Sequence, residues 1–172
     1  MKIITILILS ATIFFASCGP SPKQAAKYNS AVTVLEKRVI KVIDSLDRSY
    51  KTFDTILIYT ALLHAEEITK KNKDILIKRL PPIGRDSSLY KAEYKFFNTI
   101  LALLKEQYYK MYRLQCIPSE KYTDKEEKYY LKIRNKKDEI IQTAFDKFRK
   151  TQSEFADRYH IKLKNKESDI DF

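Results

Sequence analysis

The stretch YNSAVTVLEKRVIKVIDSL, residues 28–46, places apolar side chains at alternating intervals of four and three residues. Because an α-helix has 3.6 residues per turn, residues at these intervals lie on one face. The pattern therefore predicts a long amphipathic helix that packs its apolar face against other helices. That face consists of Tyr28, Val32, Leu35, Val39, Val42 and Leu46.

A second helical segment follows a short interruption. The sequence DRSYKTF, residues 47–53, breaks the periodicity, and Thr52 or Asp54 is suited to cap the next helix. That helix is expected to end at Leu80, because the sequence PPIGRDSS, residues 81–88, is rich in turn-forming residues. Its predicted apolar stripe is Leu57, Ala61, His64, Ile68 and Ile75.

Two more helical segments complete the chain. The third is expected to stop at Ile117, because the residue before Pro118 disfavours the helical conformation. Thr123 and Glu126 match a capping box at the start of the fourth, which loses its period after Leu163. The predicted buried positions are Phe97, Leu101, Leu104, Tyr108 and Met111 in the third helix, and Tyr130, Ile133, Ile140, Ile141, Ala144, Phe145, Phe148, Phe155 and Tyr159 in the fourth.

The fold class follows from these segments and from the scarcity of glycine. The chain has 2 glycines in 172 residues, whereas strand-and-turn proteins need glycine at tight turns. We therefore expect an all-α fold, an up-down-up-down four-helix bundle with long helices joined by short connections. The alternative is a three-helix bundle with a long bent first helix, because the interruption at residues 47–53 is short. Seams this regular also pair between chains, so the oligomeric state stays open.

The amino terminus has the layout of a secretory signal peptide: Lys2, a short apolar run and then small residues. The sequence Phe15-Ala16-Ser17-Cys18 resembles a bacterial lipobox. The resemblance implies cleavage before Cys18, diacylglycerol (and so palmitate-like chains) on its sulfur and acylation of the new amino terminus. The alternative is an uncleaved anchor, or a plain signal peptide with an incidental cysteine. We expect a lipoprotein signal peptide over residues 1–17, a lipidated tether over 18–24, a helical bundle domain over 25–163 and a frayed or disordered tail over 164–172.

The charge balance is basic. The net charge is +11, and it becomes +10 when Lys2 is removed with the signal peptide. Because an exported, lipid-anchored protein does not meet nucleic acid, we expect no nucleic-acid partner. Anionic lipid headgroups or other envelope polyanions are the alternative partners. The simpler interpretation is that the lysines are solvated helix faces in a chain of biased composition.

Residues with catalytic or metal-binding chemistry are scarce. The chain has 2 histidines and 2 cysteines and no Gly-rich phosphate loop or Cys-x-x-Cys motif. His64 lies on an apolar stripe, which makes a metal-binding or small-molecule-binding bundle centred near His64 the alternative function. Cys116 is expected to be a small apolar core residue near a helix end. We therefore expect no catalytic residues, no metal ligands, no cofactor and no enzymatic activity.

The mature chain resembles a group of uncharacterised helical-bundle lipoproteins and surface proteins from Bacteroidota and spirochaetes. The resemblance rests on the lipobox, on residues 25–29 (AAKYN), on the break at residues 80–82 (LPP) and on residues 104–110 (LKEQYYK). It implies a lipid-anchored envelope bundle without a known activity, and it assigns a role to Cys18 alone.

The expected function is therefore non-catalytic: a structural or partner-binding lipoprotein of the cell envelope, attached to the membrane through acylated Cys18. Gly19 is not the Asp that directs inner-membrane retention, and no acidic run typical of surface export follows. We expect the outer membrane, facing the periplasm, to be its location.

Overall fold

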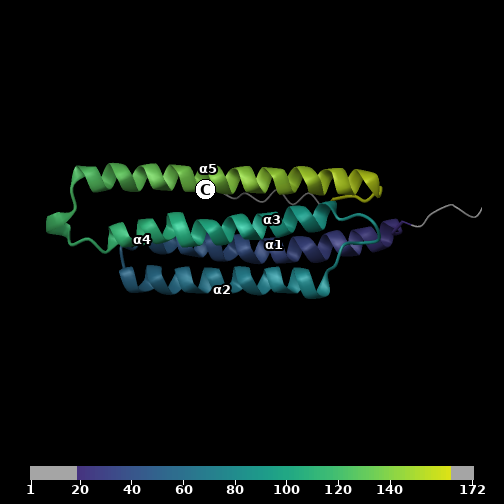
Figure 1. The fold of residues 1–172 in the computed structure, drawn as a ribbon, viewed down its shortest axis with the longest axis horizontal. Coiled ribbons are helices and arrows are strands. Elements are labelled where there is room, and N and C mark those ends of the chain that lie inside the picture. Colours follow the sequence, from purple (N-terminus) through teal and green to yellow (C-terminus); the bar gives the residue numbers. More distant parts are fainter. Residues whose placement is uncertain (1–18, 164–172) are drawn as a thin grey trace, which may run out of the picture.

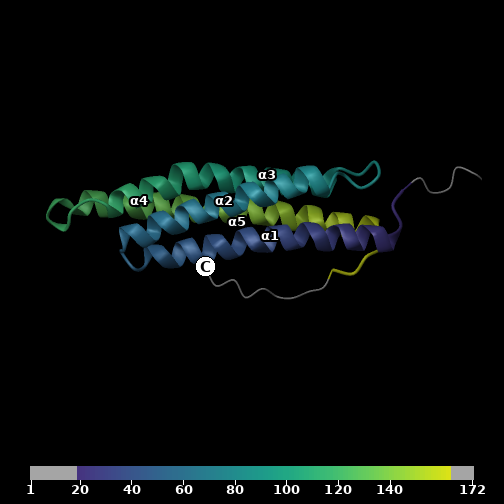
Figure 2. The ribbon, with the colours of Figure 1, turned by 90° about the horizontal axis from the view of Figure 1, so that it is seen from below.

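The computed structural model describes residues 19–163, and this part of the chain contains helices and short connections but no β-strand. Each long helix runs antiparallel to the one before it (Figures 1 and 2). The predicted all-α, up-down-up-down four-helix bundle is confirmed. The elements are α1 (Pro22–Tyr50), α2 (Thr55–Arg79), α3 (Ser88–Leu103), η1 (Leu104–Tyr108), α4 (Tyr109–Gln115), η2 (Ser119–Lys121) and α5 (Asp124–Arg158).

The third rod of the bundle consists of α3, η1 and α4 without a break in the chain. The segment η1 is a π-helix, which inserts extra backbone into a helical turn. The whole rod ends close to the predicted position, Ile117, because α4 finishes at Gln115 and Cys116 is its C-cap.

The turn between α1 and α2 excludes the alternative three-helix architecture. Phe53 adopts a left-handed φ of 58°, and the Asp54 side chain accepts hydrogen bonds from the backbone amides of Ile56 and Leu57 at 2.9 and 3.0 Å. The interruption is nevertheless shorter than predicted. Residues 47–50 are helical, because Ser49 and Tyr50 are buried at the end of α1.

The first helix begins inside the predicted tether. Ser21 and Gln24 form a capping box. The backbone amide of Gln24 donates to the Ser21 hydroxyl (3.3 Å), and the backbone amide of Ser21 donates to Gln24 Oε1 (2.8 Å). Pro22 occupies the first turn, where its missing N–H costs nothing. The bundle therefore starts at Pro22 instead of residue 25, and Gly19, Pro20 and Ser21 are the described part of the tether.

The buried face of α1 matches the predicted seam, except that Ile43 is buried more deeply than Val42. The capping box of Thr123 and Glu126 also forms at the start of α5. The largest fully buried side chains include Tyr108, Phe97, Phe148, Phe155, Leu46, Ile58, Leu76, Leu89 and Ile100.

The predicted stripe of α2 is wrong by one residue, which is a rotation of about 100°. The helix buries Ile58, Leu62, Ala65, Thr69, Asn72 and Leu76 instead. Its first half is apolar on several faces, so the sequence pattern does not single out the buried one. Packing against α1 and α3 selects that face, and it leaves Leu57 and His64 exposed.

The remaining predictions lie outside the described residues. They are the signal peptide over residues 1–17, the lipidation of Cys18 and the tail over 164–172.

Candidate functional site

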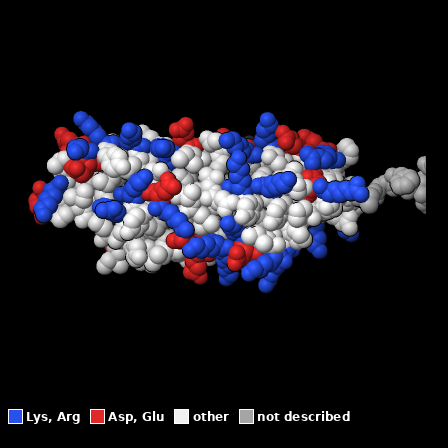
Figure 3. Space-filling model, viewed as in Figure 1, with Lys and Arg blue, Asp and Glu red and all other residues white. Residues whose placement is uncertain are grey.

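An apolar surface covers the end of the bundle where α1 turns into α2. Residues 55–65, TILIYTALLHA, include no charged side chain. Phe53 and Ile56 are 72% and 80% exposed, and further apolar side chains surround them. In Figure 3 the surface over this part of α2, at the lower left, carries few charges. We call this surface the distal patch, and it consists of Phe53, Ile56, Leu57, Tyr59, Leu63 and Tyr109.

Contacts between tilted aromatic rings connect α2 and α4 at the distal patch. The ring of Tyr59 in α2 lies 5.3 Å from that of Tyr112 in α4, and Tyr112 lies 6.0 Å from Tyr109. Exposed Lys110 and Arg113 adjoin these tyrosines in α4. Aromatic and basic side chains of α4 therefore lie together at the surface, whereas Tyr108 is buried as predicted.

A groove of about 500 Å³ lies along the surface between the packed helices α3 and α5. Its floor is apolar and includes Phe96, Ile140 and Phe148. The charged side chains exposed at its rim are Lys95, Lys136, Lys147 and one acid, Glu139. Small side chains on both helices leave this space open, because they cannot fill it. The volume lies in the range of sites for small molecules. The small side chains that line it are Ala92, Thr99, Thr143, Ala144 and Thr151.

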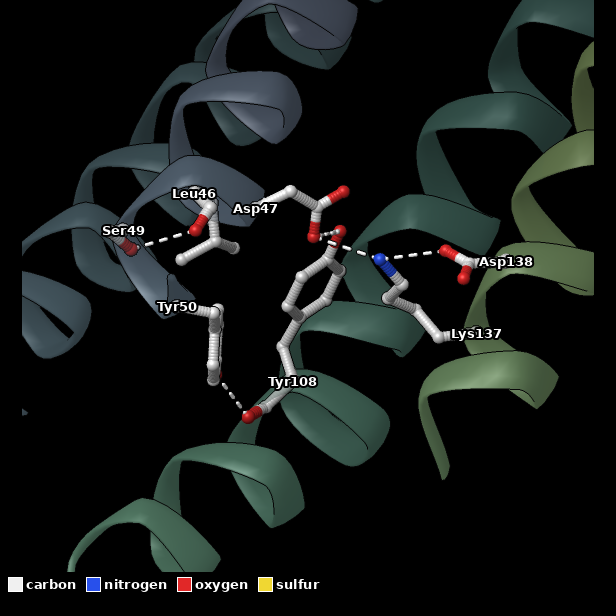
Figure 4. Close-up of polar contacts among 7 residues, drawn as sticks. All are labelled: Leu46, Asp47, Ser49, Tyr50, Tyr108, Lys137 and Asp138. Atoms are coloured by element: carbon white, nitrogen blue, oxygen red, sulfur yellow. Dashed lines mark hydrogen bonds and ion pairs between the residues drawn. The ribbon is translucent and has the colours of Figure 1, made fainter. Parts of the chain in front are cut away.

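A polar network joins α1, η1 and α5 near the distal end (Figure 4). The side chain of Lys137 is 4% exposed, and its ammonium nitrogen lies 2.8 Å from carboxylate oxygens of both Asp47 and Asp138. The hydroxyl of Tyr108 donates to Asp47 at 2.9 Å, and the Tyr108 ring lies 5.1 Å from the Lys137 nitrogen. The Tyr50 hydroxyl donates to the backbone carbonyl of Tyr108, an acceptor in the π-helical segment.

This network is a cross-link of the bundle, because its charges are paired with each other. Burial and the neighbouring carboxylate of Asp47 raise the pKa of the Tyr108 hydroxyl well above its usual range. That hydroxyl therefore stays neutral and donates a hydrogen bond. Lys137 also belongs to the basic run at residues 132–137, but it does not contribute to a basic surface.

Two carboxyl groups are buried without a hydrogen bond from any described residue: Glu36 in α1 and Glu93 in α3. Burial raises the pKa of Glu36 to about 7, although Arg149 of α5, whose Nε lies 3.7 Å from Glu36 Oε1, opposes the shift. Burial, with a contribution from the charge of Glu36, raises the pKa of Glu93 well above its usual range. Burial therefore favours the protonated form of both carboxyl groups.

A metal site requires more ligands than this pair provides. Within residues 19–163, no group of three or more His, Cys, Asp and Glu side chains is placed to hold a metal ion. The two buried acids lie inside the partly exposed side chain of Arg149, whose Nε is buried. Sequence periodicity missed this polar cluster because Glu36 and Glu93 are charged residues at core positions.

The residues predicted to carry chemistry are dispersed. His64 is exposed on α2, away from the buried stripe, so no bundle core surrounds it. Cys116 is exposed at the C-cap of α4, which corrects the expectation that it is a core residue. Cys18 lies outside the described residues.

A helix long and apolar enough to cross a membrane does not occur in residues 19–163.

Comparisons of the chain with protein-family models, with curated proteins and with solved structures found no match. The function is therefore argued from the residues and geometry described above.

Proposed function

We propose that this protein is a lipid-anchored, non-catalytic lipoprotein of the bacterial cell envelope that holds a protein partner away from the membrane surface. The observation that carries this proposal is the distal patch. Contiguous exposed apolar surface, with aromatic residues and adjacent basic side chains, is typical of protein–protein interfaces. We place the protein in the outer membrane, facing the periplasm.

The short tether supports this arrangement. Helix α1 starts at Pro22, so only Gly19, Pro20 and Ser21 separate it from Cys18. Three residues span roughly 10 Å when fully extended. With 29 residues at 1.5 Å per residue, α1 extends about 44 Å from that point to the turn beside the distal patch. A bundle anchored at Cys18 can therefore carry the patch tens of ångströms away from the lipid.

The anchor is tested by the intact mass and membrane fractionation of the full chain beside Cys18→Ser. We expect a mass that corresponds to an acylated chain starting at Cys18, and loss of membrane association in the variant. An unmodified wild-type chain that still fractionates with membranes would refute lipidation and indicate a retained anchor in residues 1–17.

The partner surface is tested by site-specific photo-crosslinking in cells. A photoreactive residue at Ile56 or Leu63 is expected to give one adduct of defined mass, whereas the same residue at exposed Lys95 gives none. An adduct of twice the chain mass would identify a second copy as the partner. Equal labelling from all three positions, or none from the patch, would contradict the proposal.

A second candidate function is the binding of an anionic amphiphile, such as a fatty acid, in the groove between α3 and α5. The apolar floor and the lysines at the rim favour it. We expect a fluorescent fatty acid to bind the purified protein and Ala144→Phe, which fills the groove, to abolish binding. The matched variant Ala61→Phe on α2 is expected to bind as the wild type does.

A further inference from the structure

The end of the bundle that holds the start of α1 is rich in exposed basic side chains. They come from α1, the end of α2, the connection at residues 80–87, the start of α3 and the end of α5, which lie together at one end (Figure 1). We call this surface the basic end, and it consists of Lys23, Lys27, Lys78, Arg79, Arg85, Lys91, Arg158 and Lys162.

Acidic side chains neutralise only part of the basic end. Asp86 is paired with Arg158, and Asp74 lies 3.7 Å from Lys78. Glu154 and Asp157 are the other exposed acids at this end, and Glu93 is buried beneath it. The remaining basic side chains form no ion pair with any residue in the described range, so their charge faces solvent: Lys23, Lys27, Arg79, Arg85, Lys91 and Lys162.

The basic end packs directly against the tether. A Cβ atom added to Gly84 would lie 3.2 Å from Cδ of Pro20, so the connection at residues 80–87 contacts a residue two positions after Cys18. The Tyr28 hydroxyl also donates to the carbonyl of Leu80 at 3.3 Å, which ties the same connection to α1. Arg85 is therefore held beside the chain segment that leads to the anchor.

The opposite end of the bundle is also basic, but its charges lie far from the tether. Acidic residues there offset the basic ones only in part. The basic residues are Arg48, Lys51, Lys110, Arg113, Lys121, Lys125, Lys128, Lys132, Arg134, Lys136 and Lys137, and the acidic residues are Asp44, Asp47, Asp54, Glu120, Asp124, Glu126, Glu127 and Asp138. The basic end is therefore set apart by its position beside the tether and not by a larger excess of charge.

We infer that the basic end is a second membrane contact, which binds the headgroups of anionic phospholipids beside the lipid anchor. This inference rests on the proposed function, because Cys18 acylation brings this end to the membrane. Basic side chains close to an anionic surface are attracted within about one Debye length, roughly 10 Å at 0.1 M salt. The tether is no longer than this distance, so these side chains lie within range. The contact fixes the bundle upright and orients the distal patch away from the lipid.

The test separates this contact from the acyl chains by using residues 19–172 without lipid. The whole buried core lies between Ala25 and Ala156, so this chain keeps every core contact. We expect it to sediment with vesicles of phosphatidylcholine and phosphatidylglycerol but not with phosphatidylcholine alone, and to be released at high salt. The charge-reversed variant Lys23→Glu/Arg85→Glu/Lys91→Glu is expected to bind at least roughly tenfold more weakly.

A matched variant controls for net charge and folding. The substitutions Lys51→Glu, Lys121→Glu and Lys125→Glu change the charge by the same amount at exposed positions of the distal end. We expect this variant to retain wild-type binding. Equal weakening in both variants, or no binding of the wild-type chain to anionic vesicles, would overturn the inference. Neither result would bear on the lipidation of Cys18, which the fractionation of Cys18→Ser tests separately.

Discussion

The two ends of this bundle differ in which side chains they bury and which they expose. At the basic end, Phe155 is fully buried between the rings of Tyr28 and Tyr159, and charge covers the outside. At the distal end, Phe53 and Ile56 face solvent, and a charged group, Lys137, is buried in a paired network. Four helices close a core at either end, so the difference shows that stability does not dictate what each end exposes. The exposed chemistry is instead the best guide to what each end contacts.

The strongest test of this comparison is the loss of the buried ring at the basic end. Phe155→Ala is expected to lower the free energy of unfolding by about 3–5 kcal/mol, because it removes a fully buried aromatic side chain and leaves a cavity. Chemical denaturation of the purified chain measures the effect. A loss below about 1 kcal/mol would show that this end is not closed as described.

The buried carboxyl group of Glu36 makes the free energy of unfolding depend on pH. The pKa of Glu36 is about 7 in the folded chain and near 4.5 in the unfolded chain. The unfolded state therefore ionises first, and the free energy of unfolding falls as the pH rises from about 4.5 to about 7. By linkage, Glu36→Gln is expected to recover about 3 kcal/mol at pH 8 and to change little at pH 4.

Denaturation curves of the wild type and Glu36→Gln at both pH values measure this contribution. The matched variant Glu67→Gln, an exposed glutamate on α2, is expected to leave the pH dependence unchanged. Greater stability of the wild type at pH 8 than at pH 4, with no gain in Glu36→Gln, would contradict the assigned burial.

The paired charges of Lys137 and Asp47 at the distal end are expected to stabilise the folded chain near neutral pH, whereas ionisation of Glu36 destabilises it. Asp47→Asn removes one of the two carboxylates around buried Lys137, so we expect a loss of about 1–3 kcal/mol near neutral pH. Thermal unfolding at pH 7 measures it, with Asp54→Asn as a control because asparagine also caps helices well. A neutral effect of Asp47→Asn would mean that Asp138 alone satisfies Lys137.

Gly84 tests the contact between the basic end and the tether. Its φ of 58° favours glycine, and an added methyl group would press on Pro20. Gly84→Ala is expected to destabilise the chain by about 1 kcal/mol and to weaken binding to anionic vesicles, because Arg85 is displaced. The double variant Gly84→Ala/Pro20→Ala, measured by the same two assays, is expected to recover part of the loss. No recovery would show that backbone strain alone is responsible.

The smallest effect on stability is expected at the distal patch. Ile56 is 80% exposed, so Ile56→Ser is expected to change the free energy of unfolding by less than about 0.5 kcal/mol while reducing crosslinking to the partner. A large loss of stability would show that Ile56 belongs to the core of the chain and not to an interaction surface.

Local sequence information was sufficient where the signal was local or strongly periodic. The seam of α1 and the capping box of Thr123 and Glu126 were predicted correctly, because capping and helical periodicity depend on residues three or four positions apart. The scarcity of glycine and the prolines at residues 81–82 predicted the all-α class and one of its turns for the same reason.

Long-range packing decided the rest. The choice of buried face on α2, the exposure of His64 and Cys116 and the convergence of Lys137 with Asp47 depend on residues that come together only after the helices pack. The same holds for the distal patch, the groove between α3 and α5 and the basic end, on which function is proposed. The sequence alone determined the all-α class and a basic charge, whereas tertiary structure excluded the three-helix alternative. It also decided which apolar side chains stay in water and which basic side chains gather beside the tether. The physical reason is that periodicity limits the faces a helix can bury, while the neighbouring helices determine which face it does bury.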